Sequence, residues 1–153
     1  MDGPTAHNAH LVLLHFGRAR VALAQRGVRS LEAAADVDFS AAPPGTLGVI
    51  VASGGRWPVF ALDDELVPLR AAPRDRRICA LLAHDDRLYG LLCDEAQVLP
   101  RQGLAAYPLP LAMRRPGTPL EGVLQTNEGV ALLSSARSLA SVVKVETRAL
   151  EVA

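Results

Sequence analysis

The segment Arg87–Val98, RLYGLLCDEAQV, determines the fold that we expect for this chain. It follows the turn-forming pair Asp85-Asp86, runs through apolar residues with a tyrosine and a glycine, and becomes acidic after Cys93. A short apolar run of this kind is typical of a buried strand rather than a helix. A second apolar run, Ile78–Ala83, lies just upstream, and the residues between the two runs suit a tight turn. The sequence therefore predicts a central β-hairpin with other strands on both sides of it.

The composition bounds the size of the core and the kinds of partner. Half of the 153 residues are apolar but only 4% are aromatic, so the core must be mainly aliphatic. Basic and acidic residues are equal at 16 each, so the chain lacks the basic excess that is typical of proteins that bind nucleic acid or anionic membranes. Arg74, Arg76 and Arg77 form a local basic cluster that Asp75 interrupts, and we interpret it as a solvated loop. One domain, or two small packed subdomains, is expected.

The cysteines and the ends of the chain indicate the compartment. Cys79 and Cys93 both lie inside apolar runs, where buried free thiols are expected. The first ten residues contain no apolar segment typical of a signal peptide, and no apolar run is long enough to span a membrane. We therefore expect a cytoplasmic protein without direct membrane insertion.

No motif in the sequence indicates catalysis or a cofactor. The histidines His7, His10 and His15 have no cysteine or carboxylate at a recognised metal-ligand spacing, so no metal is expected. The acidic cluster 63–65 has no facing group that would make a general acid–base pair, and a solvated turn is expected there. Phosphate-binding loops and nucleophile motifs do not rise above chance. The sequence predicts a protein that is not an enzyme and carries no cofactor.

The remaining elements follow from short apolar runs and their breakers. Strands are expected at 11–16, 20–24, 47–52, 57–62, 96–99, 120–125 and 130–133. Val28–Ala35 suits either a short helix or a strand, whereas the proline-rich residues 100–119 predict a surface connection without long regular elements. Ser134 is expected to cap a short helix that ends at Val142 or Val143. Many short strands without a strand–helix rhythm predict β-barrels or a sandwich.

The order of three motifs resembles the CheW-like domain of bacterial chemotaxis and motility signalling. GVIVASGGRWPVFAL, residues 48–62, is similar to the family pattern Gly-x-Ile-Asn-x-Arg-Gly followed by Pro-Val-x-Asp-Leu. GLLCDEA, residues 90–96, is similar to Gly-Leu-x-Val-Asp-x-Val, and residues 120–133 look like the closing hairpin of the family. Residues 28–31 also fit the pattern Val-x-Glu-Ile. The resemblance extends over about residues 10–142.

The resemblance implies a fold, a domain organisation and a role. It implies two small five-stranded β-barrel-like subdomains packed on a shared aliphatic core, with one or two short helices. Residues 1–10 would be a flexible lead, 11–143 the CheW-like domain, and 144–153 a C-terminal strand or tail. Members of the family are non-catalytic adaptors that couple the regulatory domain of a CheA-type histidine kinase to the signalling tips of chemoreceptors, and relatives serve type IV pilus twitching systems.

Six residues are assigned to partner surfaces by the resemblance. Val28, Leu31 and Gly90 align with the kinase-facing region of the family, and ordinary packing is the alternative role for each. Ser53, Gly54 and Trp57 fall in the degenerate receptor-facing motif, where the glycine also suits a simple hairpin turn. Trp57 would be a binding hot spot if exposed and a core residue if buried.

The chain departs from the family pattern at several positions. The Asn and Arg of the first motif are Val51 and Ser53, its Asp is Ala61, the Glu of Val-x-Glu-Ile is Ser30, and the Asp after the closing hairpin is Ser134. Serine and valine do not supply the rigid fork of donors that arginine offers. We therefore expect a diverged adaptor with a weakened or replaced receptor contact. The alternative is a divergent CheW-like paralogue that has lost coupling to the kinase and the receptor and binds another scaffold or itself.

Overall fold

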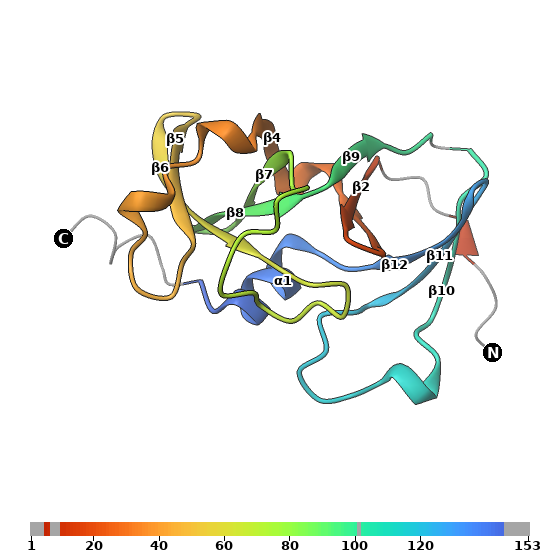
Figure 1. Ribbon diagram of the computed structural model, residues 1–153. Helices are drawn as coiled ribbons and strands as arrows, with labels where there is room; N and C mark the ends of the chain where they lie inside the picture. The colour runs from red at the N-terminus through yellow and green to blue at the C-terminus, as the bar shows by residue number, and fades with distance from the viewer. Residues whose placement is uncertain (1–4, 7–9, 101, 146–153) are drawn as a thin grey trace.

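The computed structural model describes residues 5–6, 10–100 and 102–145 and consists mainly of two β-sheets (Figure 1). The larger sheet has the strand order β1-β10-β11-β12-β3-β2-β9, and the smaller has the order β4-β7-β8-β6-β5. The strands of the larger sheet are β1 (Thr5–Ala6), β2 (Leu11–Phe16), β3 (Ala19–Ala24), β9 (Glu95–Val98), β10 (Ala105–Tyr107), β11 (Gly122–Thr126) and β12 (Gly129–Leu133). Those of the smaller sheet are β4 (Val28–Ala33), β5 (Gly48–Ala52), β6 (Gly55–Ala61), β7 (Ile78–His84) and β8 (Arg87–Cys93).

The predicted central hairpin is confirmed. Strands β7 and β8 pair antiparallel along their whole length, from Ile78 opposite Cys93 to His84 opposite Arg87. Asp85 takes a positive φ of 54° in the turn, a conformation that aspartate tolerates better than most residues. On its other edge β8 pairs with β6 in parallel, so the hairpin lies in the middle of the smaller sheet.

The smaller sheet curls into a barrel-like form. The chain leaves β4, passes through two short 3-10 turns, Ala34–Asp36 and Phe39–Ala41, and returns to the edge of β5. There the backbones of Asp38 and Val49 exchange two hydrogen bonds, of 2.8 and 3.0 Å. This bridge joins the continuation of one edge strand to the other edge. Val28–Ala35, whose sequence suits either a helix or a strand, is thus a strand followed by the start of a 3-10 turn.

The larger sheet differs from the five-stranded expectation, because seven strands of the described chain belong to it. One of the additional strands, β10, lies inside the proline-rich connection. The prolines of that connection leave residues 101–107 free, so three of these residues can pair with β11, and Thr5–Ala6 then pairs with β10. The connection is therefore part strand rather than surface loop throughout.

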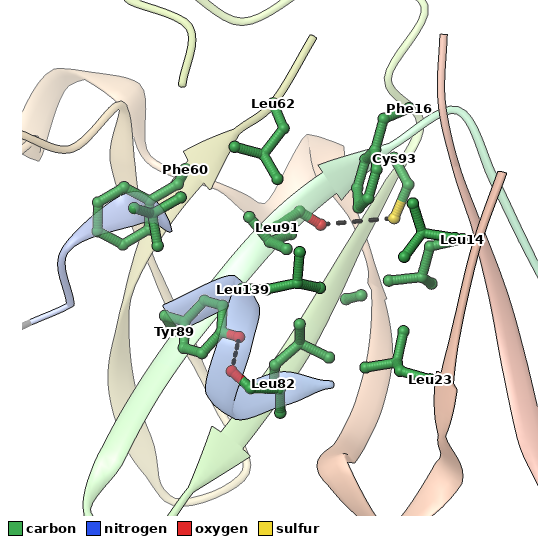
Figure 2. Close-up of a cluster of buried hydrophobic side chains, with 14 of the residues drawn as sticks. Leu14, Phe16, Leu23, Phe60, Leu62, Leu82, Tyr89, Leu91, Cys93 and Leu139 are labelled. Atoms are coloured by element: carbon green, nitrogen blue, oxygen red, sulfur yellow. Dashed lines mark hydrogen bonds between the residues drawn. The ribbon is translucent and has the colours of Figure 1, made fainter. Parts of the chain in front are cut away.

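A shared aliphatic core joins the two sheets, as expected. Leu14, Phe16 and Leu23 of the larger sheet pack in one cluster with Leu82, Tyr89 and Leu91 of the smaller sheet and with Leu139 of the helix α1, Ala136–Val143 (Figure 2). The buried hydroxyl of Tyr89 donates a hydrogen bond to the Ala136 carbonyl oxygen. Since α1 contacts both sheets at their junction, it completes the core (Figure 1).

Two details of the helix and one of the loop correct the sequence interpretation. The N-cap is Ser135, whose hydroxyl accepts a hydrogen bond from the Ser138 amide; Ser134 is buried and donates to the Pro119 carbonyl oxygen instead. Arg76 is also buried, at 7% exposed, and is not part of a solvated cluster. Its guanidinium forms an ion pair with Asp94 and donates a hydrogen bond to the Leu92 carbonyl oxygen, contacts that the sequence pattern does not reveal.

The described residues also bear on the cysteines and the chain ends. Cys79 and Cys93 are free, buried thiols, as expected. Cys79 pairs with Leu92 in the ladder, so the two thiols lie on opposite faces of the sheet and in different core clusters. The prediction of a flexible lead and a C-terminal strand or tail falls mostly on residues 1–4, 7–9 and 146–153, outside the described residues, and stays a prediction.

Candidate partner-binding surface

Leu31 and Gly90 lie near the middle of the smaller sheet, whereas Val28, Ser53, Gly54 and Trp57 lie at one of its ends, which we call the turn end. It carries the β5–β6 turn at Ser53-Gly54, the β7–β8 turn at Asp85-Asp86 and the first residues of β4. Between them is a hollow of about 300 Å³. It is lined by Arg29, Ser53, Gly54, Gly55, Trp57, Asp85, Asp86 and Leu88. The hollow is thus polar at its rim, with both signs of charge present.

The β5–β6 turn is held in a fixed shape. Ser53 and Gly54 both have positive φ, at 48° and 77°, which defines the tight hairpin turn that favours glycine at its second central position. Trp57 is 3% exposed, and its indole Nε1 donates a hydrogen bond of 2.7 Å to the Ala52 carbonyl oxygen just before the turn. Trp57 therefore supports the turn from within the core, whereas Ser53 and Gly54 present the exposed surface.

Strand β4 presents the aliphatic part of the surface. Its residues alternate between half-buried and exposed, as in a strand with one face on the core. Val28 is half-buried and packs against the shared core, while Leu31 points outward and is 43% exposed. An exposed leucine on an edge strand is available for contact with another protein.

The structure brings the two predicted sets of residues together. The hydroxyls of Ser30 on β4 and Ser53 in the β5–β6 turn are 3.4 Å apart, within hydrogen-bond distance. The strand that the resemblance assigns to the kinase and the turn that it assigns to the receptor are therefore adjacent at this contact. Ser30 and Ser53 are also two of the positions at which the sequence departs from the pattern that it resembles, so two departures that are distant in sequence lie together.

Gly90 lies inside the sheet rather than on its surface. It pairs with Leu81 on one side and Val59 on the other, and it is buried. A Cβ atom at this position would be 2.7 Å from the Cys79 sulfur, closer than real Cβ contacts allow. Gly90 is required for close packing in the middle of the sheet, which supports the alternative of ordinary packing for this residue.

The buried cysteines and Tyr89 are held in their neutral, protonated forms. Burial raises the pKa of the Cys79 and Cys93 thiols to about 12 and raises that of the Tyr89 hydroxyl further. A thiol with such a pKa stays protonated at neutral pH and is a poor nucleophile. Within residues 5–6, 10–100 and 102–145, no three His, Cys, Asp or Glu side chains are placed to hold a metal ion.

The fold and the surface together define the class: a two-sheet β protein with a shared core, one short helix, and exposed turns and strand faces. The chain has a CheW-like fold. The crystal structure of the scaffolding protein TtCheW from Thermoanaerobacter tengcongensis matches with a TM-score of 0.62 and 19% sequence identity, over 83% of this chain and 88% of that one. No protein-family model and no curated protein matches the chain by sequence. No helix among the described residues is long and apolar enough to cross a membrane.

Proposed function

We propose that this protein is a non-catalytic adaptor in the cytoplasm that couples a CheA-type histidine kinase to chemoreceptors, in a bacterial chemosensory or type IV pilus twitching system. The fold likeness to a scaffolding protein supports a role in assembly. The observation that carries the proposal is the Ser30–Ser53 contact, which makes the predicted kinase-facing strand and receptor-facing turn neighbours. An adaptor needs such adjacent faces in order to bring two partners together.

The kinase contact in this proposal is centred on β4. Leu31 supplies exposed aliphatic surface, Val28 fixes the strand on the core, and Gly90 lets the sheet beneath pack closely. Complete burial of a leucine side chain contributes about 2 kcal/mol. Because Leu31 is already half-covered, we expect it to contribute about 1 kcal/mol or more to binding, enough to change the affinity severalfold.

The test of the kinase contact is calorimetric titration with the regulatory domain of the CheA-type kinase from the same genome. We expect micromolar binding, and Leu31→Asp should weaken it at least tenfold because a carboxylate would be buried in an apolar contact. Val130→Asp is the matched control, because Val130 is 55% exposed on β12 of the other sheet. Absence of binding by the folded wild-type protein would contradict the kinase assignment.

The receptor contact in this proposal involves Ser53 and Gly54, with Trp57 beneath them. The charged fork of the family arginine is missing here, so we expect weaker binding to a receptor signalling tip than a family member with that arginine shows. Reconstitution of the purified protein with receptor tip and kinase measures this directly. Receptor binding as tight as that of such a family member would contradict a weakened contact.

A second candidate function is a paralogue that binds another scaffold or a second copy of itself. The observation that favours it is Val51, which occupies the position of the family asparagine and is 73% exposed. A polar contact residue is thus replaced by an exposed aliphatic one. Sedimentation velocity on the wild-type protein and on Val51→Asn tests this candidate: self-association that the substitution abolishes would support it, and a monomer at all concentrations would rule out the self-binding form.

A further inference from the structure

The opposite end of the smaller sheet, which we call the loop end, carries a second and larger hollow. It is an open groove of about 720 Å³. It is lined by Ala34, Ala35, Phe39, Ala42, Thr46, Leu47, Arg70, Ala71, Ala72, Pro73, Arg74, Arg76 and Leu92. These residues come from the 3-10 turns after β4, the segment just before β5, the loop between β6 and β7, and the end of β8. The groove is separate from the turn end, because the strands of the sheet lie between the two.

The walls of the groove are apolar and made mostly of small side chains. Alanines contribute five of the lining residues, and Phe39 is 46% exposed at the edge. Small side chains leave width for the side chains of another molecule. An open groove of this size differs from the enclosed pockets that bury most of a small ligand, and it suits an extended peptide segment lying across the surface.

The charge of the groove has one sign. Arg70 and Arg74 are exposed at its rim, Arg76 lies in its floor, and no aspartate or glutamate lines it. Among the described residues neither Arg70 nor Arg74 forms an ion pair. The carboxylates nearest in sequence to the lining residues, Asp36, Asp38 and Asp75, lie outside the lining and form no ion pair with either arginine. The rim therefore attracts negatively charged groups.

The loop that carries these arginines is fixed to the fold. The Asp63 carboxylate accepts hydrogen bonds from the amides of Glu65 and Val67, and the Leu69 amide donates to the Ala61 carbonyl oxygen. Further along, the Arg76 guanidinium is 2.7 Å from the Asp94 carboxylate and donates to the Leu92 carbonyl oxygen at 3.0 Å. A groove held in this way pays little ordering entropy when a ligand binds.

We propose that the loop-end groove binds an acidic, aliphatic peptide segment of a partner protein, with aliphatic side chains against the alanines and carboxylates on Arg70 and Arg74. This activity goes beyond the coupling role assigned to the turn end and does not depend on it. The alanine-rich walls and the unpaired cations Arg70 and Arg74 fit that chemistry and do not fit a basic or a wholly polar segment. Recognition requires both features, so each provides a separate test.

The test uses fluorescence anisotropy with three labelled octapeptides: alternating glutamate and leucine, alternating lysine and leucine, and alternating glutamate and serine. We expect micromolar binding of the glutamate–leucine peptide, at least tenfold weaker binding of the lysine–leucine peptide and at least fivefold weaker binding of the glutamate–serine peptide. Undetectable binding of the glutamate–leucine peptide, or binding of either other peptide as tight as that of the glutamate–leucine peptide, would overturn the proposal.

Variants locate the binding on the molecule. Arg70→Glu with Arg74→Glu should weaken binding of the glutamate–leucine peptide at least tenfold. Arg115→Glu with Arg137→Glu is the matched control: both arginines are exposed and outside the groove, and the change in net charge is identical. Far-ultraviolet circular dichroism confirms that each variant is folded. Equal weakening by both double variants would show a non-specific charge effect and would overturn the assignment to this groove.

Discussion

The two ends of the smaller sheet connect their strands in different ways. At the turn end the strands are joined by two-residue turns, Ser53-Gly54 and Asp85-Asp86, whose shape is set by local backbone conformation. At the loop end the residues from Leu62 to Arg77 connect β6 to β7; local hydrogen bonds of Asp63 hold the start of this loop, and long-range contacts of Arg76 and Arg77 hold its end. The turn end therefore depends mainly on local backbone conformation, whereas the loop end also needs contacts with distant parts of the chain.

This difference determines what each end can present to a partner. The turn end presents tight turns next to the start of β4, the strand that carries the exposed Leu31. The loop end presents a groove, because a long connection can curve away from the sheet and leave a concave surface. The shape of the groove depends on Arg76. Its guanidinium lies over the Phe16 ring and forms an ion pair with Asp94, and these contacts link the loop to both sheets.

The largest effect is expected from removing Arg76 and so releasing the loop end. Arg76→Ala should lower the free energy of unfolding by about 2–3 kcal/mol, because it leaves the mostly buried Asp94 carboxylate without its ion pair. Urea unfolding measures the loss. Hydrogen exchange should become faster in residues 62–77 and stay unchanged in the β5–β6 and β7–β8 turns.

Arg77 offers the control for this prediction. It is the next residue and is exposed, so Arg77→Ala should change stability by less than about 0.5 kcal/mol. If both variants unfold alike, or if exchange at the turn end rises with that at the loop end, the two ends are not stabilised independently.

An intermediate effect is expected in the middle of the sheet, which both ends share. Gly90→Ala should cost about 1–3 kcal/mol, because its Cβ would be 2.7 Å from the Cys79 sulfur in a closely packed core. Adding Cys79→Ala should recover part of the loss, since it removes the clashing atom. Thermal and urea unfolding of the single and double variants measure both effects.

Gly55→Ala is the matched control for Gly90. The nearest atom to a Cβ at Gly55 is the Trp57 Nε1 at 3.8 Å, an ordinary contact, so little destabilisation is expected. A similar loss of stability in both variants would mean that backbone freedom, and not the contact with Cys79, explains the glycine at position 90.

The smallest effect is expected at the turn end. Ser53→Asn should stabilise the protein by about 0.5 kcal/mol, because asparagine adopts the positive φ of this position more readily than serine. The melting temperature should rise slightly. A fall would show that the hydrogen bond between Ser53 and Ser30 contributes more than the backbone preference.

Most strands follow from the sequence because their causes are local. Short apolar segments between turn signals predicted the central hairpin and the closing hairpin, and the structure confirms both. Strand β10 was missed because three residues beside prolines carry no periodic pattern, and only pairing with β11 makes them a strand. Ser135 rather than Ser134 became the helix cap because the Ser134 hydroxyl has a distant partner, the Pro119 carbonyl oxygen.

The candidate site likewise combines features that the sequence predicts with features that only distant contacts create. The resemblance named residues of β4 and of the β5–β6 turn, but no spacing in the sequence indicated that Ser30 and Ser53 touch. The sequence is compatible with Trp57 as either a binding hot spot or a core residue, and its burial shows that the ring belongs to the core. The loop-end groove could not be predicted from the sequence, because Arg74 and Arg76 occur in the same arginine cluster although Arg74 is exposed and Arg76 is buried.

The sequence by itself determined the aliphatic core, the strand-rich fold with a central hairpin and the buried free thiols, since hydropathy and turn preferences act over a few residues. The tertiary structure alone decided which arginine enters the interior, which serines meet and where the surface is hollowed. These outcomes depend on contacts between residues far apart in the chain, and such contacts are selected only when the two sheets pack around their common core.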